Sequence, residues 1–326
     1  MATVHTLNAS PDTVHVGTFD ARHAPVLTVA SGDTVEMQCV SGLAEVAPGP
    51  QSGFTLPPGL AEIHAAVAEK RLNASGHILT GPVAVEGAEP GDCLRIDIEA
   101  IEPGSDWGYN FFRPLVGTLP DDFPYRRMVH IAVDRAARRC HLPFGSGNGL
   151  SLPLSPFFGV MGVAPPAEWG TIATKEPRAH GGNLDNKELV AGSTLYLPVH
   201  YAGALFSAGD GHGIQGDGEV CITALEMSLT GRFKLTLQKG GGQHDPASRF
   251  PRAETPTHYI SMGIHEDLDL AMKQALREMI AFIADRSDLS PAEAYQFCSL
   301  AVDFRVTQTV NGEKGVHGML RKGLLF

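Results

Sequence analysis

Residues 93–98 read Cys93-Leu94-Arg95-Ile96-Asp97-Ile98, and their polarity alternates with a period of two. The apolar Leu94, Ile96 and Ile98 fall on one side of an extended chain, and the charged Arg95 and Asp97 fall on the other. This alternation is typical of a β-strand that buries one face. The turn residues Pro90-Gly91-Asp92 come directly before it and mark where the strand starts. We therefore expect a fold built on half-buried strands.

Further short runs rich in β-branched residues lie on both sides of this strand. We predict strands at 14–19, 26–29, 34–37, 194–199, 220–225, 233–237 and 304–310, the last of them ended by Asn311-Gly312. The Pro- and Gly-rich segments 103–128 and 140–182 are interpreted as long loops, which in compact domains are usually functional or mobile. The 37 Gly and 23 Pro residues show no period, which favours a turn-rich β protein over a collagen-like or low-complexity one.

Helical periodicity occurs in three places. Apolar residues on one side of 60–72 predict a short helix. From about 266 to 285, apolar residues at i, i+3, i+4 and i+7 spacing predict a long amphipathic helix with acidic residues in its first turn. Ser290-Pro291-Ala292-Glu293 is a capping box with Pro at the first helical position, and it predicts a helix over about 291–301.

These elements predict a mainly β chain whose C-terminal part is α/β. We place a mainly β core with the candidate catalytic segments at 1–240. An α/β portion at 241–326 contains the two late helices, and its last strand returns to the core. The length of 326 residues fits two domains, and a hydrophobic content of 43% is enough for a sizeable core.

The charge balance and the cysteines narrow the classes of function. The 25 Lys and Arg residues against 36 Asp and Glu residues give a net charge of −11, which argues against a nucleic-acid partner and against binding to an anionic membrane surface. Residues 1–12 lack a signal-peptide pattern, and no stretch approaches the roughly 18 apolar residues of a membrane span. Five widely spaced cysteines without a C-x-x-C pair exclude a cysteine zinc site and suit a reducing compartment. We therefore expect a cytoplasmic protein.

The densest polar segment of the chain is 204–220. It contains Asp210, His212, Gln215, Asp217 and Glu219, interleaved with glycines that allow a sharp turn or a close approach to a ligand. Carboxylates and an imidazole that converge on one point are what a divalent metal needs. A solvated Gly/Asp turn is the alternative. The apolar residues on both sides argue against it, because they indicate that the acids enter and leave a buried region, where unpaired charge is costly.

Two other places offer polar groups for the same site. Asn183 and Asp185 alternate within 181–187, so both face one side of an extended chain, although an Asx-rich turn explains the pattern equally well. His77 stands close to a Gly-Pro turn. A lone His in such a place is more often a hydrogen-bonded structural residue than a ligand.

The familiar catalytic and nucleotide-binding motifs are missing or incomplete. Gly211, Gly213 and Gly216 fit the pattern G-x-G-x-x-G. The strand-like run that follows them argues against a dinucleotide-binding fold, which needs a helix there. No G-x-S-x-G and no H-E-x-x-H pattern occurs in the chain. The sequence therefore offers neither a serine nucleophile elbow nor a metalloprotease helix.

Taken together, several segments resemble the acetamidase/formamidase family. They are His77–Pro82, Gly87–Asp92, Gly181–Asp185, Gly203–Glu219 and Asp303–Gln308. The most specific of them is the Gly-Asp-x-His-x-x-Gln-Gly-Asp-Gly-Glu phrase that ends at Glu219. The resemblance covers about residues 15–326, which is nearly the whole chain.

The resemblance implies a β-sandwich-like core with an α/β subdomain. It also implies hydrolysis of small aliphatic amides to a carboxylate and ammonia. The expected cofactor is a divalent metal, with Zn²⁺ first and Ca²⁺ as the alternative. The expected assembly is a homodimer or a larger homo-oligomer, and the expected partner is a small-molecule amide.

On this hypothesis the polar residues take two kinds of role. The leading metal ligands are His212, Asp210 and Asp185, with His77 as a further candidate and Asp217 as a replacement for any of the acids. A metal would lower the pKa of its bound water and polarise the amide carbonyl. Glu219 is the expected general base, which then protonates the departing nitrogen. Asn183 and Gln215 are expected to hydrogen-bond the substrate amide or the oxyanion.

Two other functions stay open. A non-catalytic or carbohydrate-binding β-sandwich would use the acidic cluster to hold a structural Ca²⁺ through oxygen ligands, without His. A metal-dependent hydrolase of a larger cyclic or aryl amide would line its pocket with the aromatic residues of 107–113. Packing in the core or between subunits is the plainer explanation of those aromatic side chains.

Overall fold

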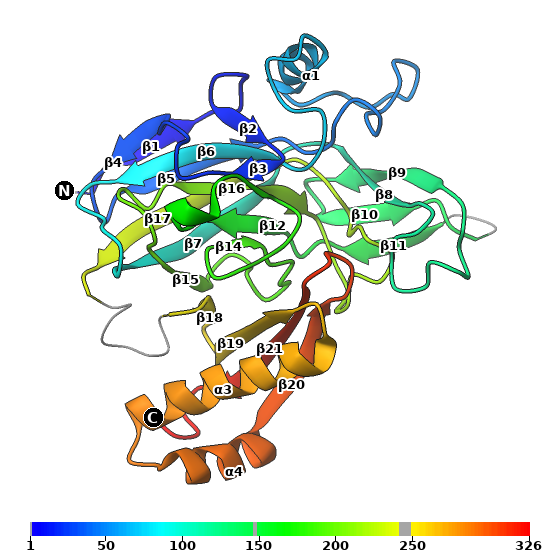
Figure 1. Cartoon of the computed structure of the whole chain (residues 1–326). Helices are drawn as coiled ribbons and strands as arrows, with labels where there is room; N and C mark the ends of the chain where they lie inside the picture. The colour runs from blue at the N-terminus through cyan, green and yellow to red at the C-terminus, as the bar shows by residue number, and fades with distance from the viewer. Residues whose placement is uncertain (1, 146–148, 241–248) are drawn as a thin grey trace.

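The structure is a computed structural model that describes residues 2–145, 149–240 and 249–326. Within these residues the chain is mainly β, with two large sheets, two smaller sheets and three α-helices (Figure 1). The predicted fold class is therefore confirmed. In the same residues no helix is long and apolar enough to span a lipid bilayer.

The larger sheet has nine strands, and all neighbouring strands in it are antiparallel except β1 and β5. In spatial order the strands are β1 (Val4–Leu7), β5 (Thr34–Cys39), β17 (Leu229–Gln238), β7 (Cys93–Pro103), β15 (Thr194–Pro198), β18 (Arg252–Glu254), β19 (His258–His265), β21 (Lys314–Arg321) and β20 (Val302–Gln308). The strand predicted at 93–98 is the start of β7. Leu94, Ile96 and Ile98 are buried, as the alternation predicts, while Arg95 pairs with Asp97 at 2.8 Å on the other face.

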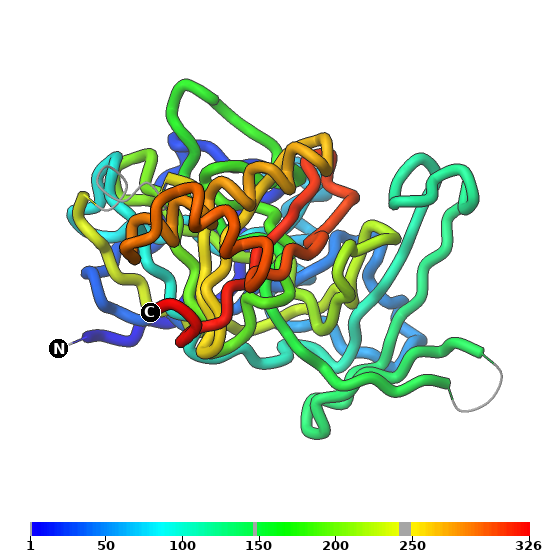
Figure 2. The backbone as a smooth tube through the Cα atoms, turned by 90° about the horizontal axis from the view of Figure 1, so that it is seen from below, coloured from blue at the N-terminus to red at the C-terminus, as the bar shows by residue number. Residues whose placement is uncertain are grey.

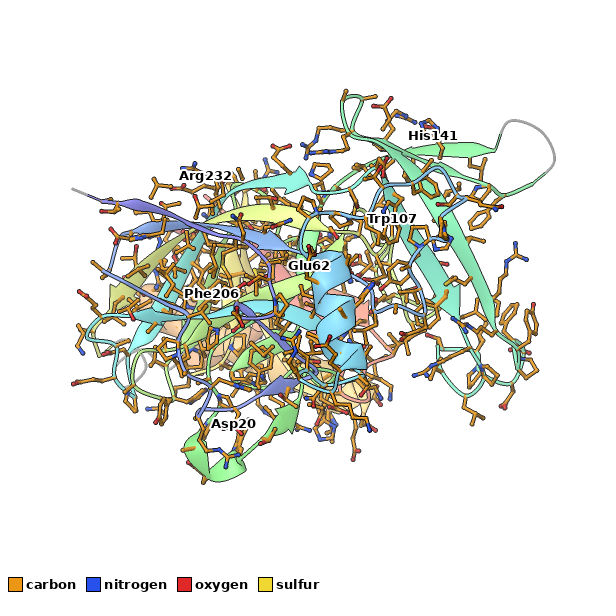
Figure 3. The ribbon with its side chains drawn as sticks, turned by 90° about the horizontal axis from the view of Figure 1, so that it is seen from above. Asp20, Glu62, Trp107, His141, Phe206 and Arg232 are labelled. Atoms are coloured by element: carbon orange, nitrogen blue, oxygen red, sulfur yellow. The ribbon has the colours of Figure 1, made fainter. Side chains whose placement is uncertain are left out.

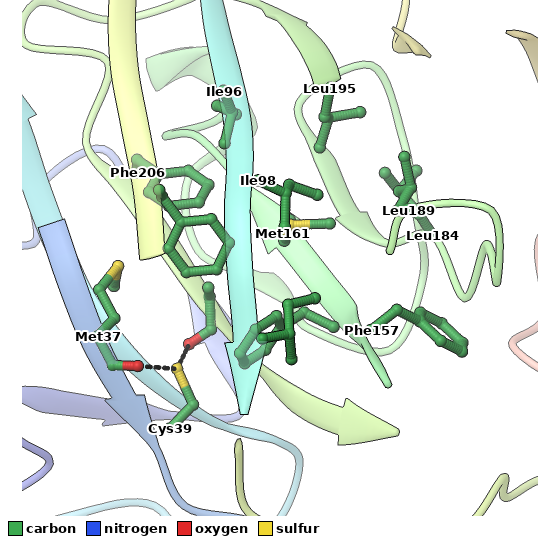
Figure 4. Packing of buried hydrophobic residues seen from close by; sticks show 14 of the residues in the cluster. Met37, Cys39, Ile96, Ile98, Phe157, Met161, Leu184, Leu189, Leu195 and Phe206 are labelled. Carbon is green, nitrogen blue, oxygen red and sulfur yellow. Dashed lines mark hydrogen bonds between the residues drawn. The ribbon is translucent and has the colours of Figure 1, made fainter. Parts of the chain in front are cut away.

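The second large sheet lies against the first. Its strands, in spatial order, are β14 (Gly181–Asn183), β12 (Phe157–Gly162), β16 (Phe206–His212), β6 (Ile78–Val85) and β2 (Val14–Val16), with β4 (Leu27–Val29) parallel to β6. Phe233 of the nine-stranded sheet makes edge-on ring contacts with Phe158 and Phe206 of the second sheet. Cys39 Sγ donates to the carbonyl of Ala208 across the same interface (Figure 4). The core is thus a two-layer β-sandwich with interleaved apolar side chains.

A smaller sheet forms an arm at one end of the sandwich (Figure 2). It contains β8 (Trp107–Phe112), β9 (Arg127–Asp134), β10 (Arg139–Leu142) and β11 (Leu150–Pro153). Trp107 at the base of the arm belongs to the same buried cluster as Leu60 and Ile63 of α1 (Leu60–Ala68). Helix α1 lies near the centre of Figure 3, and Trp107 is labelled beside it. The remaining two strands are β3 (Thr18–Phe19) and β13 (Ile172–Ala173), which pair with each other.

Both late helices are found close to their predicted positions. α3 (Leu268–Arg286) packs on β19 and β21, and α4 (Pro291–Ala301) packs beside it (Figure 1). The Asp267 side chain caps α3, and the predicted capping box of Ser290 and Glu293 is present at α4. The predicted division of the chain at residue 240 stays a prediction, although β18 to β21 continue the nine-stranded sheet.

Four predictions of local structure are wrong. The segment 103–128 is not one long loop, because it contains β8, and 140–182 contains β10 to β13. A further strand, β21, follows the strand that was predicted to be the last. No strand forms at 220–225, where Ile222 has a φ of 84°. There the Thr223 hydroxyl and the Asn110 amide bond to the neighbouring backbone, and this pairing replaces a strand ladder.

Candidate active site

The candidate site lies where strands of the second sheet end. Asp210 and His212 belong to β16, and Asp185 comes two residues after β14. Glu219 and Glu226 lie on the segment that connects β16 to β17. Each of these five side chains is buried, with His212 at 0% exposure and Asp210 the least buried at 9%. The fold therefore gathers four carboxyl groups and one imidazole with little exposure to bulk water.

His212 is the centre of this group. Its Nε2 lies 3.3 Å from Asp210 Oδ2, 3.3 Å from Glu226 Oε2 and 3.8 Å from Asp185 Oδ1. Two sets of ligand-type atoms lie within 4.8 Å of one another: Asp185, His212 and Glu219 in one set, and Asp210, His212 and Glu226 in the other. The predicted convergence of Asp185, Asp210, His212 and Glu219 is thus present in the geometry.

A glycine makes room for the cluster. Gly159 of β12 faces Asp210 across the ladder between β12 and β16. A Cβ atom on Gly159 would lie 2.5 Å from both Asp185 Oδ1 and Asp210 Oδ2, and 2.9 Å from a ring carbon of His212. These contacts are shorter than real Cβ atoms make, so any larger residue would displace the carboxylates.

The backbone at the acidic residues is strained. Asp185, Asp210 and Glu219 have φ angles of 47°, 55° and 44°, in the left-handed region that non-glycine residues rarely adopt. Such conformations persist only where the surrounding structure holds them, and they cluster at functional sites. Three of them around one histidine indicate that the fold holds these carboxyl groups in place at a cost in stability.

Two amide side chains fix the orientation of the cluster. Gln215 Oε1 lies 2.9 Å from His212 Nδ1, and Gln215 Nε2 donates to the Asp185 carbonyl at 2.7 Å. Because Gln215 Nε2 is the donor to Asp185, Gln215 Oε1 accepts from Nδ1–H of His212, and Nε2 is the ring atom that faces the cluster. Asn311, from the turn between β20 and β21, donates to Asp185 Oδ2. Both amides are therefore engaged with the site residues themselves.

The pKa of every ionisable group in the cluster is shifted, by burial or by the neighbouring charges. Burial raises the pKa of Glu226 to about 7 and raises that of Asp185. Burial together with the Asp185 carboxylate raises the pKa of Glu219 well above its usual value. Burial also opposes charge on Asp210 and on His212, but their attraction to each other and to neighbouring groups is stronger. As a result the pKa of Asp210 is lowered and that of His212 is raised well above its usual value.

The donor set fits a bound cation. Among the buried polar atoms of the described residues, several of the cluster have no hydrogen-bond partner: Asp185 Oδ1, His212 Nε2, Glu219 Oε2 and Glu226 Oε2. Buried carboxylates without a partner are strongly destabilising, unless a positive charge or a proton compensates them. A central imidazole nitrogen with carboxylate oxygens is a donor set that zinc and similar divalent metals accept.

The other predicted residues lie at different distances from the cluster. His77 Nε2 is 3.8 Å from Asp210 Oδ2, while its Nδ1 lies 3.0 Å from the Thr174 hydroxyl. Asn183 borders the site and donates from Nδ2 to the Lys175 carbonyl, and its buried Oδ1 has no hydrogen-bond partner in the described part of the chain. Asp217 lies apart, because its carboxylate pairs with Lys187 Nζ at 2.9 Å.

Glu226 and Asn311 are site residues that the sequence did not predict. Glu226 stands between Leu225 and Met227, and a single acid within an apolar run is a signal that could have identified it. The Asn311-Gly312 pair is so typical of a turn that it carries no sign of a second role. Its contact with Asp185 joins residues 126 positions apart.

The four carboxyl residues of the cluster form the floor of a cleft of about 550 Å³, and His212 is buried beneath its lining. The walls include His77, Asn183, Tyr109 and Phe111. Tyr109 and Phe111 are successive residues on one face of β8, and their rings stack at 6.2 Å. Part of the aromatic segment 107–113 therefore lines the cleft, while Trp107 packs in the core.

Comparison with known proteins identifies relatives along most of the chain. The model of the "Acetamidase/Formamidase family" matches residues 62–175 and 167–316. An acetamidase of Mycolicibacterium smegmatis is 31% identical over 51% of this chain and 54% of its own length. A formamidase of Methylophilus methylotrophus is 32% identical over 64% of this chain and 66% of its own length. The matched part thus spans about half to two thirds of these curated relatives.

Solved structures match over almost the full length. The acetamidase from Bacillus halodurans is 31% identical and covers 97% of both chains, with a TM-score of 0.80. The acetamidase from Yersinia enterocolitica is 27% identical, and the match covers all of this chain and 94% of that one, with a TM-score of 0.83. A gamma lactamase from Delftia acidovorans shares the fold at 23% identity and a TM-score of 0.62.

Proposed function

Because the chain belongs to the acetamidase/formamidase family, we propose that it hydrolyses the C–N bond of an amide, releasing a carboxylate and ammonia. The observation that carries the proposal is the buried cluster around His212 at the floor of an open cleft. Curated relatives named acetamidase and formamidase support the reaction type. The predicted cytoplasmic location and homo-oligomer stay predictions.

We assign the metal ligands to His212 with the carboxylates of Asp185, Asp210 and Glu226. Their unpartnered atoms and short mutual distances support this assignment. A divalent cation bound there would lower the pKa of a bound water and polarise the amide carbonyl. His212 Nε2 at the centre favours zinc over calcium, which takes oxygen ligands.

Glu219 is the proposed proton carrier of the reaction. Its Oε2 is buried and unpartnered, and it faces the cleft floor. A carboxyl group with a raised pKa must first ionise, which a bound cation nearby would favour, and its carboxylate is then a stronger base toward the attacking water than an ordinary glutamate. The same proton then passes to the departing nitrogen, which leaves as ammonia.

Two amide side chains take different roles from one another. Asn183 Oδ1 is a free acceptor on the cleft wall, so we propose that it accepts a hydrogen bond from the substrate's NH₂ group. Gln215 is engaged at both ends, with His212 and with the Asp185 carbonyl. We therefore propose that Gln215 positions His212 and does not touch the substrate. Asp217, paired with Lys187, has no place in this mechanism.

The test of the proposal is Glu219→Gln. We expect this variant to keep its metal and its fold, and to release ammonia from acetamide or formamide about 10²–10⁴-fold more slowly, the usual size of a general acid–base contribution. Glu62→Gln on the exposed side of α1 is the matched control and should keep full activity (Figure 3). Metal content by elemental analysis and ammonia release by a coupled assay provide the two readouts.

The results of these assays distinguish an amide hydrolase from a binding module with a structural ion. Near-wild-type turnover by Glu219→Gln would remove that residue from the mechanism. A purified protein that holds calcium through oxygen ligands and releases no ammonia from any amide would instead support a binding module with a structural ion.

A further inference from the structure

The cleft has acidic side chains at its floor and basic side chains at its mouth. The four carboxyl residues of the cluster are buried in its lining and form its floor, whereas Arg113, Arg126 and Lys175 in its lining are exposed and mark its mouth. One acid, Glu45, also borders the mouth. A ligand that reaches from mouth to floor therefore meets positive charge first and the hydrolytic site last.

The two arginines occupy equivalent places on the arm. Phe112 of β8 pairs with Arg127 of β9, so Arg113 and Arg126 are the first residues beyond the ladder on its two strands. Arg113 continues the alternation of Tyr109 and Phe111, and all three line the cleft. The hairpin thus presents a stacked aromatic wall that ends in a pair of guanidinium groups.

Within the described residues these three cations are not paired with a carboxylate. In the part of the chain that the structure describes, the side chains of Arg113, Arg126 and Lys175 make no ion pair and no hydrogen bond, whereas Arg95, Arg138 and Arg178 each pair with a carboxylate. Unpaired guanidinium groups at the mouth of a cleft are suited to bind a carboxylate in a bidentate manner.

The size of the cleft also indicates a ligand larger than formamide or acetamide. A volume of about 550 Å³ lies within the range of pockets that hold ligands of many atoms. Formamide and acetamide, with only a few heavy atoms each, would fill a small part of it. Tyr109 adjoins the floor, because its backbone pairs with that of Glu226, whereas Phe111 and Arg113 lie farther along the chain and are left for a longer ligand.

We propose that the preferred substrate is an amide with a second, anionic end, joined to the amide through an apolar or aromatic spacer. Arg113 and Arg126 bind the anionic end, Tyr109 and Phe111 contact the spacer, and the amide lies at the cluster. This inference rests on the proposed function. In the reaction the C–N bond breaks, the water oxygen joins the carbonyl carbon, and the nitrogen leaves as ammonia.

The experiment compares matched amides with the metal-loaded full-length enzyme. One pair is the monoamide of glutaric acid and pentanamide, and the other is the monoamide of terephthalic acid and para-nitrobenzamide. We expect kcat/KM to be about tenfold or more higher for the anionic member, with a preference that falls as salt is added. The double variant Arg113→Gln/Arg126→Gln should lower kcat/KM for the anionic amide about tenfold more than for its neutral partner.

A neighbouring arginine provides the control. Arg127→Gln removes an exposed cation from the same hairpin outside the cleft lining, and it should keep the wild-type preference. Equal kcat/KM for both members of each pair, or equal losses in the double variant, would overturn the inference and leave the proposed function intact. If no amide of either kind releases ammonia, the proposed function itself fails.

Discussion

At the scale of one residue, Gly159 shows that the site has no room for an added side chain. The position has no side chain, and two carboxylate oxygens occupy the space that a Cβ would fill. We expect Gly159→Ala to displace Asp185 and Asp210, and to lower kcat/KM by about a hundredfold, since small misplacements of reacting groups have effects of this size. Gly49→Ala is the matched control, because no atom lies near its added methyl group.

The readouts for this pair are ammonia release, metal content and thermal stability. A Gly159→Ala protein with normal metal content and normal activity would contradict the close packing described here. Overpacking of this kind costs typically about 1–3 kcal/mol of stability, so the variant should remain folded while it loses its metal.

At the same scale, the sequence predicts those site residues that lie close to one another along the chain. Asp210, His212 and Glu219 lie within ten positions, and their spacing among glycines and apolar flanks predicts a buried polar site. No spacing of this kind in the neighbouring sequence predicts the roles of Glu226 and Asn311. Their roles depend on contacts with Asp210, His212 and Asp185 that only the folded sheets create.

At the scale of one element, α4 depends on its N-terminal cap. The Ser290 hydroxyl accepts from the Glu293 amide, and the Glu293 carboxylate accepts from the Ser290 amide. We expect Ser290→Ala to lower the free energy of unfolding by about 1 kcal/mol. Ser299→Ala, at an exposed position inside the same helix, lacks a capping role and should not lower it. Urea unfolding curves with equal slopes would measure the difference.

Helix α3 contains a carboxyl group that responds to pH. Burial raises the pKa of Glu278 from 4.5 to about 7. Below the unfolded pKa the group is neutral in both states and the full stability is present. As the pH rises from about 4.5 to about 7, the unfolded chain has released this proton while the folded chain still holds it, so stability is lost over this range. We expect Glu278→Gln to be stabilising by about 1–2 kcal/mol at about pH 8, and close to neutral at about pH 5.

The control for this prediction lies on the same helix. Asp285→Asn removes an exposed acid and should shift unfolding by the same small amount at both pH values. If Glu278→Gln gives the same stability difference at both values, the carboxyl group ionises as freely in the folded protein as in the unfolded one.

Elements with strong local signals were predictable, and those that depend on distant partners were not. The late helices have caps and a clear 3.6-residue period, so their bounds differ from the prediction by few residues. The run 220–225 has strand-like residues, but the side chains of Asn110 and Thr223 take its hydrogen bonds. In contrast, β8 forms in a Gly- and Pro-rich stretch because β9 pairs with it.

At the scale of the whole molecule, a bound metal should stabilise the fold. Four buried carboxyl groups lie around His212, and a ligand that binds only the folded state adds about 4 kcal/mol when present at a thousand times its Kd. We expect a chelator to lower the Tm by about 5 °C or more, and added Zn²⁺ to restore it. A Tm that chelator leaves unchanged, in a protein shown to contain metal beforehand, would place the metal outside this cluster.

The site also depends on the order in which the chain is made. Its parts are contributed by segments from His77 to Asn311, and Gly218, next to Glu219, pairs with Thr307 and Thr309 of the last hairpin. A chain that is still being translated therefore carries Asp210 and His212 long before Asn311 leaves the ribosome. Until residues 302–321 have emerged, a nascent chain lacks the contact of Asn311 with Asp185 and the pairing of Gly218 with Thr307 and Thr309, so we expect the cluster to close only once this hairpin has folded.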